Sequence, residues 1–178
     1  MATAQTRPQL VMRPAREDDA AAVREIFNEA VQDGLATFDS ESRSTEEQRR
    51  LIAAAAQDPK HPIVVAELRG WVLGWITIQP YNLRPQVEDI GEAIVYVRRS
   101  FRNYGVGRQL MRTVQKEAQR LAYRKLIGWV LAENRDSLGL CRATGWREVG
   151  RHEQHARHGD RQRDVIVVEY LVPPALAT

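Results

Sequence analysis

The sequence predicts one domain of the α/β (α+β) class, with a mixed sheet of about seven strands flanked by about four helices. Its 178 residues suffice for one full hydrophobic core and are too few for two ordinary domains. Hydrophobic residues make up 43% of the chain and charged residues 28%, which is typical of a globular protein. Strand and helix patterns alternate late in the chain, which favours packed layers. We expect the domain to span residues 9–172, with loose termini at 1–8 and 173–178.

The first strand and the first helix are predicted at the start of this domain. Residues 10–13 indicate a short strand. Asp18 or Asp19 can cap the helix that follows, because a side-chain oxygen at that position accepts hydrogen bonds from the first helical amides. Apolar residues then recur at the spacing of one helix face: Val23, Ile26, Phe27, Ala30 and Val31.

A second helix and a hairpin follow. Ser44 and Glu47 form the pattern of a capping box, which predicts a helix over residues 45–56. Residues 62–67 and 71–78 are rich in β-branched and aromatic residues and are separated by a short glycine-containing turn. This arrangement predicts a β-hairpin.

The second half of the chain alternates strands and helices. A helix over residues 105–121 is predicted because its apolar residues recur at helical spacing. A shorter helix over residues 134–143 stops before Gly145, which is a usual C-terminal signal. The remaining segments are a loop at 81–91 and strands at 93–97, 126–131, 146–150 and 164–171.

Basic residues gather in one stretch of the chain. Residues 98–125 carry nine Lys or Arg and one acidic residue, Glu117, whereas the rest carries 17 basic and 22 acidic residues. This distribution indicates a local site for a polyanion rather than a generally basic protein. Nucleic acid is one such ligand, but no aromatic-interleaved basic motif is present, so we expect no nucleic-acid partner.

The chain carries no signal for a membrane or for export. No apolar run approaches the ~20 residues that cross a bilayer, and residues 1–8 lack the pattern of a signal peptide. The single cysteine, Cys141, excludes an intramolecular disulfide and a cysteine-based zinc cluster. We therefore expect a cytoplasmic, reducing compartment and no membrane partner.

The strongest local motif lies between the strand that ends at Val97 and the long helix. It reads Arg102-Asn103-Tyr104-Gly105-Val106-Gly107-Arg108. Glycines let backbone amides approach an oxyanion closely, and a helix N-terminus adds partial positive charge and free donors. This geometry suits a pyrophosphate. A plain glycine turn before a solvated basic helix explains the same residues, and the motif matches neither a Walker A loop nor the full dinucleotide fingerprint.

Two further features also indicate a functional site. Asn134 and Ser137 open a helix directly after a strand, although Asn134 alone is explained as a helix cap. Glu92 stands just before the apolar strand at 93–97. A carboxylate there is either a solvated end charge or a base beside a reacting amine.

Together these segments resemble the GNAT superfamily of acetyl-CoA-dependent N-acetyltransferases. Arg102, Gly105 and Gly107 fulfil its Arg/Gln-x-x-Gly-x-Gly/Ala signature, and Asn134 and Ser137 with the pair Gly145-Trp146 fulfil its later motif. The nearest branch looks like the phosphinothricin-type acetyltransferases and amino-acid N-acyltransferases. The segments that carry this second likeness are Glu92-Ala93-Ile94-Val95-Tyr96-Val97, Ala36-Thr37-Phe38 and His61-Pro62-Ile63-Val64-Val65-Ala66-Glu67.

The resemblance implies a mostly antiparallel sheet and a site for acetyl-CoA, with no metal. The pyrophosphate would lie on the amides of Asn103, Tyr104, Gly105, Val106, Gly107 and Arg108, and Asn134 and Ser137 would contact the cofactor from the other side. The pantetheine arm would pair with the backbone of Val95, Tyr96 and Val97, where the strand splays from its neighbour. Thr37, Phe38, Ala93 and Ile94 would bind the acceptor, and Glu92 would act as the base.

The chain also departs from this family pattern. Cys141 stands where relatives carry a Tyr or a His, and its thiol is either a donor to the leaving thiolate or a small packed residue. The late segment 156–164 keeps only Asp164, so we expect an acceptor other than phosphinothricin. The run His152, His155 and His158 suits a polar acceptor-side loop better than a metal site.

The sequence leaves three functions open. The first is acetyl transfer from acetyl-CoA to the primary amine of a small amino-acid-like molecule, by direct attack and without a covalent enzyme intermediate. The second changes the acceptor to a protein N-terminus or lysine. The third is a non-catalytic module that binds CoA or nucleic acid. Relatives suggest a homodimer.

Overall fold

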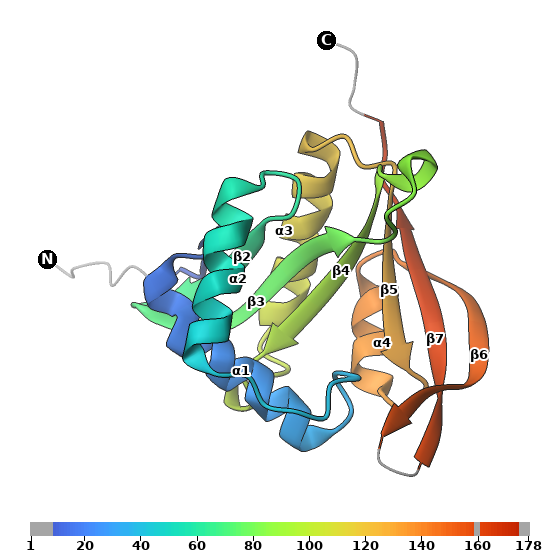
Figure 1. Cartoon of the computed structure of the whole chain (residues 1–178), viewed down its shortest axis with the longest axis horizontal. Coiled ribbons are helices and arrows are strands. Elements are labelled where there is room, and N and C mark those ends of the chain that lie inside the picture. Colours follow the sequence, from blue (N-terminus) through green and yellow to red (C-terminus); the bar gives the residue numbers. More distant parts are fainter. Residues whose placement is uncertain (1–8, 159–160, 175–178) are drawn as a thin grey trace, which may run out of the picture.

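The computed structural model describes residues 9–158 and 161–174, and within them it confirms the predicted sheet and helices (Figure 1). One seven-stranded sheet has the order β1-β2-β3-β4-β5-β7-β6. Its strands are β1 (Val11–Pro14), β2 (Ile63–Leu68), β3 (Trp71–Pro80), β4 (Ile90–Val97), β5 (Lys125–Leu131), β6 (Arg147–His158) and β7 (Arg161–Leu171). The helices are α1 (Ala20–Asp33), α2 (Thr45–Gln57), α3 (Val106–Arg120) and α4 (Arg135–Ala143).

Helices cover both faces of the sheet and divide the core into two clusters (Figure 1). On one face, Val23, Ile26 and Phe27 of α1 pack with α2 over β2, β3 and β4. On the other face, Leu110 and Val114 of α3 pack with α4 over the middle of the sheet. The predicted helix faces therefore bury as expected, because apolar residues three and four positions apart share one side of a helix.

The two middle strands, β4 and β5, part after a short pairing. They are the only parallel pair in the described sheet, and their register runs from Ile90–Lys125 to Glu92–Ile127. Strand β4 continues to pair with β3 as far as Val97. The edge of β4 beyond Glu92 that faces β5 therefore has no strand beside it, and Figure 1 shows the two ribbons diverging.

Two of the predicted helix caps are confirmed. The Ser44 side chain accepts from the Glu47 amide, and Glu47 reaches back to the Ser44 amide, so the capping box is complete. The Asn134 side chain accepts from the Ser137 amide at 3.0 Å. The prediction that the Asp19 side chain caps α1 is wrong. Asp19 stands at the N-cap position but makes no capping bond, because its carboxylate accepts from Arg13 at 2.7 Å instead.

Three strand boundaries differ from the prediction by three or more residues. Strand β4 begins at Ile90, so Glu92 lies inside the strand rather than before it. Strand β6 extends to residue 158 and strand β7 begins at residue 161, whereas the predicted strands cover only residues 146–150 and 164–171. The added strand residues lack regular alternation of apolar and polar side chains, so the sequence does not indicate a strand there. The pairing of β6 with β7 and the contacts of Asp164 hold them in place.

Candidate active site

The turn before α3 has the backbone conformation that the motif predicts. Asn103 and Gly105 have φ of 66° and 82°, in the left-handed region where residues without bulky side chains are favoured. Gly105 is the N-cap of α3, and no side chain caps this helix. The first amides of α3 have no carbonyl one turn earlier to accept from them, so they stand open at the positive end of the helix dipole.

The two glycines of the turn serve different purposes. A Cβ at Gly105 would meet nothing within 4 Å, so this position is open on its outer side and needs glycine for its φ. A Cβ at Gly107 would come within 3.1 Å of a methyl carbon of Leu140 in α4. Gly107 therefore lets α3 and α4 pack closely beside the turn.

The arginines of this segment divide into a paired and an unpaired group. Arg102 and Arg99 each form an ion pair of 2.6 Å with Asp33 of α1, and Arg98 lies 3.2 Å from Glu25. Exposed cations continue along α3, and among the described residues they have no acidic partner: Arg108, Arg112 and Lys116. The unpaired positive charge beside the turn therefore comes from α3 and not from the strand end.

A cavity of about 280 Å³ occupies the space where β4 and β5 part. Val95 and Tyr96 of β4 line one side, and Leu131 lines the other with Asn134, the N-cap of α4, and Ser137 within α4. The Tyr96 ring itself packs into the α1 core, with its centroid 5.5 Å from that of Phe27. The backbone of Tyr96, rather than its phenol, is thus the part turned to a ligand in the gap.

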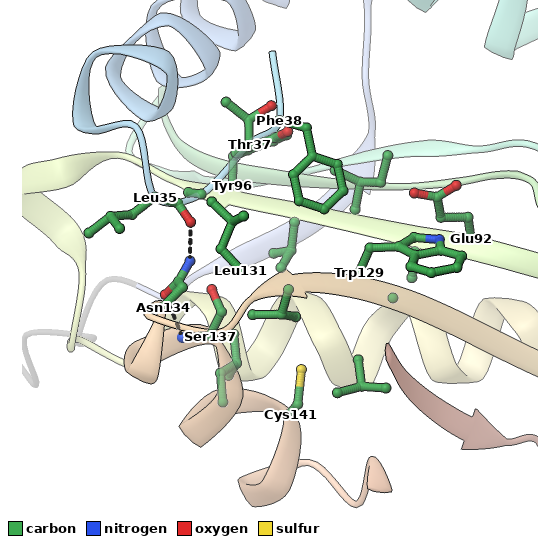
Figure 2. A pocket seen from close by; sticks show the side chains of 18 of the residues that line it. Leu35, Thr37, Phe38, Glu92, Tyr96, Trp129, Leu131, Asn134, Ser137 and Cys141 are labelled. Carbon is green, nitrogen blue, oxygen red and sulfur yellow. Dashed lines mark hydrogen bonds between the residues drawn. The ribbon is translucent and has the colours of Figure 1, made fainter. Parts of the chain in front are cut away.

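Asn134 links the two sides of this gap (Figure 2). While its oxygen caps α4, its amide nitrogen donates to the Leu35 carbonyl at 2.8 Å. Arg163 of β7 donates to the neighbouring Gly34 carbonyl. The loop that follows α1 is therefore held across the gap from its far side, and Figure 1 shows this loop reaching towards α4.

Glu92 lies at the other end of the same cavity. Its side chain points beside the Trp129 ring (Figure 2), and both residues line the cavity. Burial raises the pKa of the Glu92 carboxyl above its usual value. A partly buried carboxylate with a raised pKa in a cleft has the properties of a general base.

Cys141 lines the cavity from α4 and is 7% exposed. It packs in the core cluster beneath β5, near Trp146. Burial raises the pKa of the thiol to about 11. The thiol therefore stays protonated at neutral pH, which excludes a thiolate nucleophile and leaves a weak proton donor or a packed side chain.

A second, outer cavity of about 450 Å³ adjoins the first at Glu92, Phe38 and Trp129. Its other lining residues, His155, Ala156 and Arg157, come from β6. The four predicted acceptor residues lie together, because Thr37, Phe38, Ala93 and Ile94 all line the inner cavity.

Trp129 and Arg157 are lining residues that the sequence reasoning missed. The Trp129 ring lies in the cleft and stacks on His155 at 5.9 Å with 10° between the planes. Position and residue type alone do not distinguish the two faces of β5. The polar character of the β6 hairpin was the available signal for Arg157.

The histidine run lies on β6 and not on a loop. His152 and His155 have ring centroids 4.7 Å apart and both contact Trp129. Among the described residues no group of three potential ligands could hold a metal ion. The side chain of His158 lies outside the part that the structure describes. In the same part of the chain, no helix has the length and apolar character needed to cross a bilayer.

The model of the acetyltransferase (GNAT) family matches residues 21–146. A phosphinothricin N-acetyltransferase from Alcaligenes faecalis is 31% identical over 140 residues, which cover 78% of this chain and 71% of that protein. The crystal structure of a ribosomal-protein-alanine N-acetyltransferase from Brucella melitensis is 28% identical, with a TM-score of 0.87 over 91% of this chain and 99% of that one. A phosphinothricin acetyltransferase from Sinorhizobium meliloti, in complex with acetyl-CoA, is 24% identical and shares the fold, with a TM-score of 0.86 over 95% and 91%.

Proposed function

Because this chain belongs to the GNAT family of acetyltransferases, we propose that it transfers the acetyl group of acetyl-CoA to the primary amine of a small, amino-acid-like acceptor. The observation that carries the proposal is the parting of β4 and β5 beside the open turn of α3. A free strand edge and free helical amides, side by side, match a ligand that has both an amide-containing arm and a pyrophosphate.

The residues present fit this cofactor. The amides from Asn103 to Arg108 would hold the pyrophosphate, with the charge of Arg108 added from α3. The free edge of Val95–Val97 would pair with the pantetheine amides. Asn134 and Ser137 would lie against the arm from α4. Bound acetyl-CoA supplies the activated acyl group.

Glu92 would remove the proton from the acceptor amine, directly or through a water. Free amines have pKa values of roughly 7.7 to 10.4, so most are protonated at neutral pH and cannot attack. The raised pKa of Glu92 brings its basicity nearer to that of the amine. A backbone amide near Val95 would donate to the carbonyl oxygen as negative charge develops there. Direct attack then needs no covalent enzyme intermediate.

The shape of the cavity favours a small acceptor. Thr37 is 8% exposed, and Phe38 lines the inner cavity from the loop after α1. A protein N-terminus is the second candidate, because the Brucella relative is named for a ribosomal-protein alanine and is 28% identical. That acceptor would need the outer cavity to stay open next to Glu92. A non-catalytic module that binds CoA or nucleic acid is the third.

An acetyl-CoA turnover screen separates these candidates. Purified protein is incubated with acetyl-CoA and a panel of free amino acids, their analogues and N-terminal peptides, and released CoA is measured. We expect turnover with free amino acids or their analogues and little with peptides. Turnover only with peptides would select the protein acceptor. Acetyl-CoA binding without any turnover, or a salt-dependent shift with nucleic acid, would select the non-catalytic module.

A cytoplasmic location and a homodimer stay predictions. The location is argued from the single cysteine, and the dimer from relatives of the same branch. Light scattering of the purified protein measures the second of these directly: a mass near 41 kDa supports it, and a mass near the 20.3 kDa of one chain contradicts it.

A further inference from the structure

The outer cavity is lined by groups that match the parts of a free amino acid. Glu92 supplies a carboxylate, Arg157 a guanidinium, and Phe38 and Trp129 two aromatic rings. A zwitterion with an apolar side chain has one cation, one anion and one apolar group. The cavity therefore offers one complementary group to each.

An unusual feature of β6 brings this part of the hairpin to the cleft. Between His152 and Ala156 the register with β7 shifts, and Gln154 has φ of 52°. The four positions from His152 to Ala156 on β6 lie opposite only two positions on β7, from Val165 to Arg163. In a regular strand two residues three positions apart point to opposite faces, whereas here His152 and His155 both contact Trp129.

Asp164 holds this bulge in place. One of its oxygens accepts from the Gln154 amide at 2.7 Å, and the other pairs with Arg151. Asp164 is also the residue that this chain shares with the late motif of its family. Its contacts show what it does here: they fix the bulge that turns the following residues of β6, His155 to Arg157, towards Trp129 and Glu92.

Arg43 is a second arginine near the acceptor residues. Arg43 lines the inner cavity, but it forms an ion pair with Asp39 at 3.0 Å and lies 4.0 Å over the ring of Phe27. Arg157 is the arginine that lines the outer cavity, together with Glu92, Phe38 and Trp129.

We propose that Arg157 binds the α-carboxylate of a free amino-acid acceptor, whose amine lies at Glu92 and whose apolar side chain lies between Phe38 and Trp129. This inference rests on the proposed acetyltransferase function and narrows its acceptor. Arginine suits this role because its planar fork makes two parallel hydrogen bonds to one carboxylate. Asp164 acts as a positioning residue for it, through the bulge.

The test compares free amino acids with their amides, which keep the amine and the side chain but lose the negative charge. L-Methionine with L-methioninamide, and L-phenylalanine with L-phenylalaninamide, are assayed with wild type, Arg157→Gln and Arg157→Lys. Arg161→Gln is the matched control, because Arg161 lies on the other strand of the hairpin and lines neither cavity. The ratio of variant to wild type cancels the different reactivity of the acid and the amide.

We expect Arg157→Gln to raise the KM of the free acids about 10- to 100-fold, the range for loss of a charge-assisted contact, with little change for the amides. Arg157→Lys should restore part of the loss, and Arg161→Gln should change neither. Asp164→Asn should move the free-acid KM in the same direction by a smaller factor, with kcat nearly unchanged. Equal effects of Arg157→Gln on acid and amide would overturn the proposal.

A binding measurement separates this proposal from the proposed function. L-Methionine is titrated calorimetrically into wild type and into Arg157→Gln, each in the presence of CoA. Binding to wild type that is lost in Arg157→Gln supports the carboxylate site even if no acetyl transfer is observed. Turnover of free amino acids with equal affinity in both proteins would leave the function intact and reject the role of Arg157.

Discussion

The proposed cofactor half and the proposed acceptor half of the cleft are built in different ways. The cofactor half consists of backbone groups on regular elements: the free edge of β4 and the first amides of α3. The acceptor half consists of side chains on irregular segments: the loop after α1 and the bulge of β6. In the proposed function, the first arrangement would bind acetyl-CoA and the second would bind the acceptor.

This difference predicts that variants in the two halves fail in different ways. Changes to the backbone conformation of the turn should act on cofactor affinity, whatever the acceptor. Changes to acceptor side chains should act on KM for one class of amine and leave the cofactor bound. Glu92 lies where the halves meet and would act as the base, so its loss should lower turnover and leave the cofactor bound.

The largest effect is expected for Glu92→Gln. Loss of a general base typically lowers turnover about 10²- to 10⁴-fold, and acetyl-CoA affinity should stay within a few-fold of wild type. Because burial raises the pKa of Glu92, wild-type kcat/KM should fall as the pH drops through a value above the usual range for glutamate. Glu88→Gln, on the exposed loop before β4, is the control. Wild-type rates across the pH range would remove Glu92 from this role.

The same substitution has a predicted sign for stability. Because the pKa of Glu92 is higher in the folded than in the unfolded protein, folding favours the protonated carboxyl. The free energy of unfolding therefore falls as the pH rises through the folded-state pKa. Gln removes this penalty. Thermal unfolding at neutral pH should therefore show Glu92→Gln to be at least as stable as wild type, and a clear fall in the melting temperature would contradict this.

The next effect is expected at the turn, for which the chain offers a matched control. Gly105 and Gly70 have φ of 82° and 83°, and a Cβ at either would meet nothing within 4 Å. Valine at each should cost about 1–2 kcal/mol of stability, because a left-handed residue with a Cβ is strained. Gly105→Val alone should also weaken acetyl-CoA binding, by ten-fold or more in a calorimetric titration. Equal affinities in the two variants would argue against the turn as the pyrophosphate site.

A smaller effect is expected for the residue that joins the two halves. Asn134→Asp keeps the oxygen that caps α4 but loses the donor to Leu35. We expect thermal stability close to wild type and faster amide hydrogen exchange over residues 34–39. Asn134→Ala loses both contacts and should cost about 1 kcal/mol. If exchange over residues 34–39 is unchanged in Asn134→Asp, the contact with Leu35 does not hold the loop.

The smallest effect is expected for Cys141→Ala. With a thiol pKa of about 11, Cys141 is a weak acid, and a CoA thiolate can leave without it. Turnover should fall less than ten-fold, with a modest loss of stability from the cavity left in the core. A loss of turnover beyond ten-fold, with KM and melting temperature nearly unchanged, would instead identify the thiol as the proton donor to the leaving group.

The same contrast between the halves decides what the sequence could predict. The turn at Gly105 and the caps at Ser44 and Asn134 are local patterns within a few residues, and each is present in the structure. The parting of β4 and β5 followed from the resemblance to a family and not from the residues themselves. Backbone sites on regular elements are therefore readable from short motifs.

The acceptor half could not be predicted in the same way. The position of Arg157 beside Trp129 depends on a register shift in β6, and Asp164 on another strand holds that shift. The pairing of Arg102 with Asp33 likewise joins residues far apart in the chain. Such contacts arise only when the whole sheet is assembled, so no local pattern contains them.

The most direct test of the account is the structure of the protein crystallised with acetyl-CoA. We predict the pyrophosphate on the amides of residues 103–108 and the pantetheine arm along Val95–Val97, with the thioester carbonyl beside the acceptor cavity. A nucleotide bound at any other surface, with the gap between β4 and β5 filled by protein, would contradict it.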